Sequence, residues 1–420
     1  MKIAFVNNRY QLGGAETVMN QLWLTGRQKG HAGEIYLGEN LEKKLPAHVH
    51  FLYPAWLNRL WHSRLNRFVR RLAPHSRIRD QRLIALARQG HDLVHLHNFH
   101  GLYASTAALA SLAHSVPLIW TFHRFWGVTG GCDHPGECLR YLDACGACPR
   151  LNEWPISGHD NTSAELAEKM RLLGAAPIVV VSPSRHLAEV VKRSRVGRSW
   201  RVEVIANGVN PDEFKPVPIT ARHNLRRSLG LDPHKQLVVI VNRSFADPLK
   251  GGDILAAAIS RLDFSRTQVA LVGGETKSLL HHLPPTADVV ALGYITKRTS
   301  LASLLALAEV FLYASPRENF PCATLEAMSA GCCVVSTPTD GVLEQIEHRR
   351  EGVFSADFSG AALAEAANNV LSSPERLAKM GRAARLRVMR EFTEAAMAES
   401  YFALYAQVVA DWRKQMQNRK

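Results

Sequence analysis

Short apolar runs alternate with longer segments of helical periodicity along the whole chain. The runs are rich in Val, Ile and Leu and are only a few residues long, which is typical of strands buried in a parallel sheet. Strands that alternate with helices indicate βαβ units, so we expect an α/β protein with parallel sheets. The predicted strands are Ile3–Asn7, Glu34–Leu37, His50–Tyr53, Leu93–His97, Leu118–Phe122, Ile178–Ser182, Val202–Ala206, Leu237–Asn242, Gln268–Val272, Val289–Gly293, Val310–Ala314, Cys333–Ser336 and Gly352–Phe354.

A turn-rich stretch with little periodicity, residues 207–216, separates the first seven predicted strands from the last six. At 420 residues the chain is long enough for two domains of roughly 200 residues each. We therefore predict one Rossmann-like domain over residues 1–210 and a second over residues 211–393. A last helical pattern, about Glu394 to Lys414, lies in the remaining residues 394–420.

Composition does not point to a special class of protein. Hydrophobic residues make up 46% of the chain and charged residues 21%, which is ordinary for a globular domain. No stretch approaches the roughly 20 apolar residues that a membrane span requires. The apolar run at the start breaks at Asn7-Asn8-Arg9, too early for the core of a signal peptide. We therefore expect a cytoplasmic location.

The segment from Ser315 to Gly331 carries the most informative pattern. It follows the predicted strand Val310–Ala314, and Pro321 suits the start of a helix that Gly331 would end. Glu318 then lies on the loop at a strand's carboxyl end, and Glu326 lies on the helix behind it. In open α/β sheets, ligands bind at this edge. The alternative is that both glutamates are ordinary surface residues of a βα unit.

Two carboxylates at such an edge can each accept hydrogen bonds from a pair of neighbouring hydroxyl groups. The N–H groups at the start of a helix favour a phosphate. A ligand with a sugar at each end and a diphosphate between them therefore fits the predicted layout.

The wider pattern resembles family 4 of the retaining GT-B glycosyltransferases. Glu318 and Glu326 form Glu-x7-Glu, followed by Ala-Met-x-Ala-Gly and Val-Val-Ser. The resemblance implies that Glu318 meets the donor sugar and that Glu326 holds the ribose hydroxyls. Many members have Gly-Phe-Gly after the first Glu, whereas this chain has Asn-Phe-Pro, and Pro321 cannot donate a hydrogen bond. Three further residues of this segment are assigned to the donor site, although Cys322 on its own would be a buried core thiol: Asn319, Phe320 and Cys322.

Two cations follow the strand Leu237–Asn242. Composition alone makes Arg243 and Lys250 surface residues, but by resemblance they match the pair that holds the donor diphosphate. Two fixed cations would neutralise the charge that develops on the diphosphate as the glycosidic bond breaks. We therefore expect no catalytic metal. The donor would be a UDP-sugar or a GDP-sugar.

Other candidates for the donor site lie at further strand ends. Gly13 and Gly14 open a helix after the first strand, which allows close approach of a phosphate, although a tight turn is the simpler interpretation. His123 follows Trp-Thr-Phe and resembles the histidine that contacts the donor sugar in the family; on its own it would be structural. Gly274 and Tyr294 stand where the family's backbone meets the base.

Four of the seven cysteines are spaced Cys-x5-Cys-x6-Cys-x2-Cys. A Cys-x-x-Cys pair with two more thiols suits a structural zinc ion with no position left for water. Disulfides and unligated thiols are the alternatives, although a reducing cytoplasm disfavours disulfides. The segment, about residues 126–150, resembles an insert of colanic-acid-type glycosyltransferases. The four cysteines are Cys132, Cys138, Cys145 and Cys148.

Charge is concentrated early in the chain, whose formal net charge is +14. Residues 56–88 hold nine arginines and a single acidic residue, and from Trp56 to Leu72 apolar residues recur between the arginines at helical spacing. Such a helix suits an anionic membrane surface, and a core-packed helix with a solvated arginine face is the alternative. The residues assigned to membrane contact are Trp61, Arg64, Arg67, Arg70 and Arg71.

The resemblance implies a GT-B fold, with an N-terminal acceptor domain, a C-terminal donor domain and a last helix that returns to the first domain. We expect a retaining hexosyltransferase that acts on a polyprenyl-diphosphate-linked oligosaccharide in exopolysaccharide, capsule or colanic-acid-type synthesis, at the inner face of the cytoplasmic membrane. One alternative is a nucleotide-sugar epimerase of the same fold. A basic, zinc-containing nucleic-acid-binding protein would explain the charge and the cysteines but not the paired glutamates, so we expect no nucleic acid partner.

Overall fold

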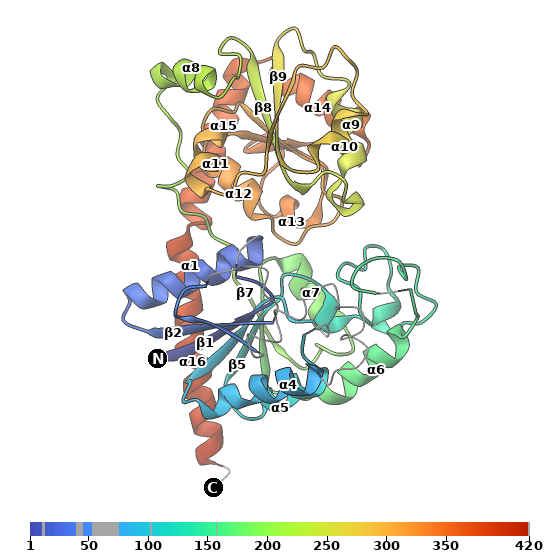
Figure 1. The fold of residues 1–420 in the computed structure, drawn as a ribbon, viewed down its shortest axis with the longest axis vertical. Coiled ribbons are helices and arrows are strands. Elements are labelled where there is room, and N and C mark those ends of the chain that lie inside the picture. The colour runs from blue at the N-terminus through green and yellow to red at the C-terminus, as the bar shows by residue number, and fades with distance from the viewer. Residues whose placement is uncertain (11–12, 39–44, 53–74, 101–102, 157, 419–420) are drawn as a thin grey trace. The chain divides into compact units, whose positions relative to one another are not determined.

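The computed structural model describes residues 1–10, 13–38, 45–52, 75–100, 103–156 and 158–418. The chain divides into two compact units. Unit 1 comprises Met1–Ala206 together with Ala398–Lys420, and unit 2 comprises Asn207–Met397. Each unit is an α/β body with one parallel sheet (Figure 1).

Unit 1 contains a seven-stranded sheet in the order β3-β2-β1-β4-β5-β6-β7. All of its pairings are parallel, and Val6 of β1 lies opposite Leu96 of β4. The order reverses direction between β1 and β4, which is where doubly wound sheets bind their ligands. The strands are β1 Lys2–Asn7, β2 Ala32–Leu37, β3 Val49–Phe51, β4 Leu93–Leu96, β5 Leu118–Thr121, β6 Ile178–Ser182 and β7 Arg201–Val204.

Unit 2 contains a six-stranded sheet in the order β10-β9-β8-β11-β12-β13, again with parallel pairs. Its order reverses between β8 and β11. The strands are β8 Gln236–Ser244, β9 Thr267–Gly274, β10 Val289–Gly293, β11 Val310–Tyr313, β12 Cys333–Ser336 and β13 Gly352–Phe354. Every strand predicted from the apolar runs is therefore present, and the predicted pair of Rossmann-like sheets is confirmed.

Helices connect the strands, as parallel pairing requires. In the described part of unit 1 they are α1 Gly14–Gln28, α4 His75–Ala85, α5 Thr106–Ala113, α6 Thr162–Leu173 and α7 Arg185–Arg193, with the short 3-10 helices η1 Leu86–Arg88, η2 Trp126–Val128 and η3 Arg140–Leu142. In unit 2 they are α8 Ile219–Ser228, η4 Pro248–Lys250, α9 Gly252–Ile259, α10 Thr276–Leu280, α11 Arg298–Leu305, α12 Cys322–Ser329, α13 Asp340–Leu343, α14 Gly360–Leu371 and α15 Pro374–Glu391. The last helix, α16 Glu394–Gln417, begins in unit 2 and continues into unit 1.

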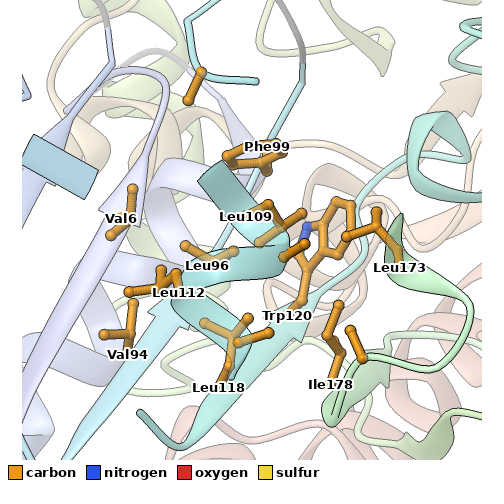
Figure 2. Packing of buried hydrophobic residues seen from close by; sticks show 14 of the residues in the cluster. Val6, Val94, Leu96, Phe99, Leu109, Leu112, Leu118, Trp120, Leu173 and Ile178 are labelled. Carbon is orange, nitrogen blue, oxygen red and sulfur yellow. The ribbon is translucent and has the colours of Figure 1, made fainter. Parts of the chain in front are cut away.

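The core of unit 1 forms where strands and helices bury their apolar faces. Trp120 of β5 lies among residues of neighbouring strands and of α5, including Leu109 (Figure 2). Burial of such side chains contributes roughly 1.5–3 kcal/mol each, which makes the sheet a rigid support for the loops at its edge. The other residues labelled there are Val6, Val94, Leu96, Phe99, Leu112, Leu118, Leu173 and Ile178.

The part of α16 that lies in unit 1 takes part in buried hydrogen bonds there. Tyr405 Oη lies 2.8 Å from His95 Nδ1, and Tyr401 Oη lies 2.9 Å from Thr121 Oγ1. Because all of these groups are buried, His95 and Thr121 would each lose one hydrogen-bond partner without the helix. The helix is therefore an integral element of unit 1.

Candidate active site

The loop after β11 in unit 2 is held by hydrogen bonds that its backbone carbonyl groups accept from side chains further along the chain. Thr339 Oγ1 donates to Ser315 O at 2.6 Å, and Gln345 Nε2 donates to Pro321 O at 2.9 Å. Pro321 caps α12, which begins at Cys322 and ends at Ser329, and Gly331 follows with φ of 89°. The loop that carries Glu318 is therefore fixed at both ends by buried hydrogen bonds.

The start of α13 approaches this loop without room for a side chain. A Cβ atom on Gly341 would lie 2.1 Å from Asn319 O, and the Gly341 amide donates to Glu318 O at 3.3 Å. Only glycine allows this contact. The position of the Glu318 loop therefore depends on Gly341.

Substituting Gly341→Ala is expected to lower the free energy of unfolding by about 1–3 kcal/mol, because the new methyl group must displace the loop. Thermal unfolding measures this loss. Leu343→Ala in the same helix is the control, since Leu343 is 47% exposed and should cost less than about 0.5 kcal/mol. Equal melting temperatures for Gly341→Ala and the wild type would contradict the close contact.

Lys250 and Glu318 form an ion pair across the point where the strand order reverses. Lys250 ends η4, and Asn242 Nδ2 of β8 donates to its carbonyl at 3.0 Å. The next residue, Gly251, is left-handed with φ of 68°, and a Cβ there would lie 1.9 Å from Ala314 O. The two strand ends therefore pack closely and bring the cation and the carboxylate together.

Arg243 is the second cation at this edge. It is the penultimate residue of the strand β8, and its side chain is exposed. Both cations predicted to hold a diphosphate thus stand at the carboxyl end of β8 or directly after it. Glu318, the partly buried partner of Lys250, would compete with an anionic ligand for the Lys250 ammonium.

Glu326 lies on α12 and is only 7% exposed. Burial raises its pKa to about 7, although Arg298 opposes the shift. Arg298 Nη1 donates to Glu326 Oε1 at 3.0 Å, and Arg298 Nε donates to Glu213 Oε2 at 3.2 Å. Arg298 therefore bridges Glu213 and Glu326, and Glu326 is the carboxylate predicted to bind the ribose.

Arg298 and Glu213 were not predicted from the sequence. Arg298 opens α11 and lies over the ring of Phe214, 4.9 Å from its centroid. No local spacing links these residues to Glu326, because they come from different connections of the fold. The only signal was that Glu213 falls in the turn-rich stretch after residue 207.

The other residues predicted to meet the donor lie on the same unit. Gly274 ends β9, and Glu275 follows it in a left-handed conformation with φ of 57°. Gly293 ends β10. Tyr294 is 48% exposed. Asn319 and Phe320 are buried, and Asn207 Nδ2 donates to Phe320 O at 2.8 Å. Cys322 is the first residue of α12, and burial raises the pKa of its thiol to about 12.

In unit 1, Gly13 caps α1 and Gly14 is its first residue. Glu16 in the first turn receives a hydrogen bond from Asn98 Nδ2 at 3.4 Å. The glycine pair therefore stands at the carboxyl end of β1, beside the residue that follows β4. This is the point of strand reversal in unit 1, as the predicted phosphate contact requires.

His123 follows β5 and belongs to a row of histidines. Its Nε2 lies 3.0 Å from His97 Nδ1, and the rings of His97 and His95 are 4.1 Å apart. His95 Nε2 lies 2.7 Å from Thr121 Oγ1. Through His95, the row reaches Tyr405 of α16.

These histidines are neutral at ordinary pH. Burial and the neighbouring Arg124 lower the pKa of His123 to about 3, and burial also lowers the pKa of His95 and His97 well below the usual value. A neutral imidazole donates through one nitrogen and accepts through the other, so one of His97 Nδ1 and His123 Nε2 donates and the other accepts. Arg124 pairs with Asp133 of the cysteine-rich segment.

The four clustered cysteines line a single pocket with Arg140 and Arg150. None of them forms a disulfide. As they are placed, no three His, Cys, Asp or Glu side chains in the described ranges stand close enough to hold a metal ion.

The residues assigned to membrane contact, Trp61, Arg64, Arg67, Arg70 and Arg71, lie outside the described residues. Among the helices of the described part, none is long and apolar enough to cross a bilayer.

Sequence comparisons divide the chain a few residues after the boundary between the two units at Ala206. Residues 12–213 match the family described as Glycosyltransferase Family 4, and residues 221–387 match Glycosyl transferases group 1. Two matched proteins of known name are D-inositol 3-phosphate glycosyltransferase from Gordonia bronchialis, 27% identical over 74% of this chain, and the putative colanic acid biosynthesis glycosyl transferase WcaC of Escherichia coli, 25% identical over 61%. The matches span 66% and 62% of those proteins, which is less than two thirds of either.

A solved structure with the same fold is HepE from Anabaena, in complex with UDP. It superposes with a TM-score of 0.70 at 20% identity, covering 97% of this chain and 100% of HepE. Together with the two parallel sheets, the likeness to HepE shows a GT-B fold. The two halves of the chain each match a glycosyltransferase family model, in agreement with the resemblance of the Glu-x7-Glu segment.

Proposed function

We propose that the protein is a retaining glycosyltransferase that moves a hexosyl group from a nucleoside-diphosphate sugar to an oligosaccharide acceptor. The observation that carries the proposal is the ion pair of Lys250 and Glu318 at the reversal point of the unit 2 sheet, with Arg243 near the end of β8 and Glu326 on α12. Cations there suit a diphosphate and carboxylates suit sugar hydroxyls. The UDP complex of HepE supports the nature of the donor.

In this reaction the bond between the anomeric carbon and the diphosphate oxygen breaks, and its electron pair passes to that oxygen. The acceptor oxygen bonds to the anomeric carbon on the same face. The departing phosphate oxygen takes the acceptor's proton. Arg243 and Lys250 stabilise the charge that develops on the diphosphate, so the reaction needs no metal ion for that purpose.

Lys250 is held by Glu318 before a donor binds. A diphosphate carries more charge than one carboxylate and would draw the ammonium from Glu318. Glu318 is then able to accept hydrogen bonds from the donor sugar. Donor binding therefore exchanges one ion pair for another at the same place.

Glu326 holds the ribose hydroxyls, and the backbone around Gly274 and Tyr294 meets the base. Asn319, Phe320 and Cys322 shape the sugar end of the site. In unit 1, Gly13 and Gly14 approach the phosphates, and the neutral imidazole of His123 contacts the donor sugar. These roles follow the family pattern.

The acceptor is a polyprenyl-diphosphate-linked oligosaccharide of exopolysaccharide or colanic-acid-type synthesis, handled at the cytoplasmic membrane surface by unit 1. The similarity to WcaC and the arginine-rich residues 56–88 support this assignment. Binding of the purified protein to vesicles with and without anionic lipid tests the surface part of the proposal.

The donor is identified by a thermal-shift screen of UDP- and GDP-sugars. The true donor binds only the folded state and should stabilise it by about 2.7 kcal/mol at a hundred times its dissociation constant. Arg243→Ala protein should lose most of this shift. A library that raises the melting temperature of neither protein would contradict the proposed donor site.

Incubation with the identified donor in the absence of acceptor distinguishes transfer from epimerisation. A transferase leaves the sugar of the donor unchanged apart from slow hydrolysis, whereas an epimerase converts it. The anomeric configuration of the product formed with acceptor then tests retention.

A further inference from the structure

We propose that Cys132, Cys138, Cys145 and Cys148 bind one structural zinc ion as a tetrathiolate. The site is separate from the donor site and lies in the segment between β5 and α6 of unit 1. It goes beyond the transfer reaction, because a zinc ion with four sulfur ligands has no open position for substrate or water.

The first observation is that all four side chains line one pocket. They come from three separate turns of the segment, and none is engaged in a disulfide. Cys138 N donates to Pro135 O at 3.1 Å, and Cys145 N donates to Arg140 O at 3.0 Å, so two of the turns are closed by their own backbone. The thiols stand further apart than ligands do, and binding would draw them inward.

The Cys-x-x-Cys turn has an unusual backbone conformation. Cys145, Gly146 and Ala147 follow one another in the left-handed region, with φ of 54°, 82° and 43°. Non-glycine residues rarely adopt it, so the turn must be held from outside. Two side chains next to α6 hold it: Thr162 Oγ1 accepts from Gly146 N at 3.0 Å, and Asp160 Oδ2 accepts from Cys148 N at 2.8 Å.

The second, independent observation is a buried cation beside the thiols. Lys169 of α6 is fully buried, and its ammonium donates to the carbonyls of Trp126 and Thr129 at 2.9 and 3.0 Å. Cys132 and Cys145 are near enough for charge on them to act on this ammonium. Its acidic partner on the same helix, Glu165, is 4.0 Å away and half exposed, and the charge of the nearby Asp133 is already paired with Arg124.

A buried ammonium is costly unless an anion compensates it. Neutral thiols provide no such anion, and a disulfide provides none either. Zinc with four thiolates carries a net charge of about −2. Lys169, together with Arg140 and Arg150 on the pocket wall, surrounds that charge with cations. The charge pattern therefore favours the metal over the two alternatives.

Such a centre would cross-link the segment that begins directly after His123. Phe125 N donates to Asp133 O at 2.9 Å, and Arg124 pairs with the Asp133 carboxylate. The zinc ion would thus fix the cysteine-rich segment, whose first residues directly follow His123 of the histidine row.

The test is metal analysis of the full chain, expressed without a polyhistidine tag and purified under reducing conditions. We expect about one zinc per chain. Replacement by cobalt should give the strong thiolate-to-cobalt charge-transfer absorption and the visible bands of a tetrahedral sulfur site. Protein that is folded but free of zinc, that contains iron instead, or that carries disulfides among these cysteines would overturn the proposal.

Matched variants locate the metal. Cys148→Ser should lose zinc, whereas Cys333→Ala, which removes a buried thiol outside the pocket, should keep it. Lys169→Met should release zinc at a lower chelator concentration than the wild type, because the compensating charge is gone. If Cys148→Ser does not fold, the zinc content and cobalt spectrum of the wild type still decide the question.

Discussion

Lys250→Ala protein should transfer its sugar about 10²–10³-fold more slowly than the wild type, with its fold intact. The ammonium is paired with Glu318 and would stabilise charge on the leaving diphosphate at the moment of bond breaking. The side chain is partly exposed, so its removal leaves no buried cavity. Initial rates with the identified donor, measured beside circular dichroism of the same sample, check both parts of this result.

The control is Lys379→Ala, which removes an exposed lysine from α15 of the same unit. It changes the net charge equally and should leave the rate unchanged. Lys250→Arg should recover part of the activity, because arginine also binds phosphate but with a different reach. Near wild-type transfer by the alanine variant would exclude Lys250 from the donor site.

Glu326→Ala protein should bind the donor about 10–100-fold more weakly, because hydrogen bonds to a charged group contribute about 1.5–3 kcal/mol. The substitution should mainly raise the KM for the donor, since the ribose lies away from the bond that breaks. Glu365→Ala, an exposed glutamate on α14, is the matched control. A donor KM equal to that of the wild type would remove Glu326 from the site.

The same carboxylate should leave a mark on stability as pH changes. Burial raises the pKa of Glu326 from 4.5 to about 7, so between these values the folded chain holds a proton that the unfolded chain has released. Stability from this group therefore falls as pH rises from about 4.5 to 7, by an amount on the order of 3 kcal/mol. In Glu326→Gln protein this slope should be absent. Chemical unfolding at pH 5 and pH 7.5 measures the difference, and an unchanged slope in the variant would contradict the buried carboxylate.

The apolar runs were sufficient to predict the sheets because strands buried on both faces carry a strong local signal. Val310–Tyr313 and Ile178–Ser182 are entirely or almost entirely buried, and both were found within a residue. The loop after β11 was also predictable, since Pro321 and Gly331 mark the limits of α12 in the sequence itself. The positions of Glu318 and Lys250 follow from those limits and from the order of the strands.

Contacts between distant segments could not be predicted in the same way. Arg298 meets Glu326 from a different helix, and Tyr405 meets His95 from a helix hundreds of residues later. Neither pair has a fixed spacing that a sequence pattern could show. The close approach of Gly341 to Asn319 O was equally hidden, because a glycine in a turn has many simpler explanations.

Because α16 supplies Tyr401 and Tyr405 to the interior of the first sheet, that sheet depends on residues from both ends of the numbering. On the ribosome, the first two hundred residues would emerge long before the helix that completes their interior. A fragment that stops at residue 206 should therefore be a poor folder, with Thr121 and His95 missing their tyrosine partners. Adding a synthetic peptide of residues 394–418 in trans should improve its yield of folded protein.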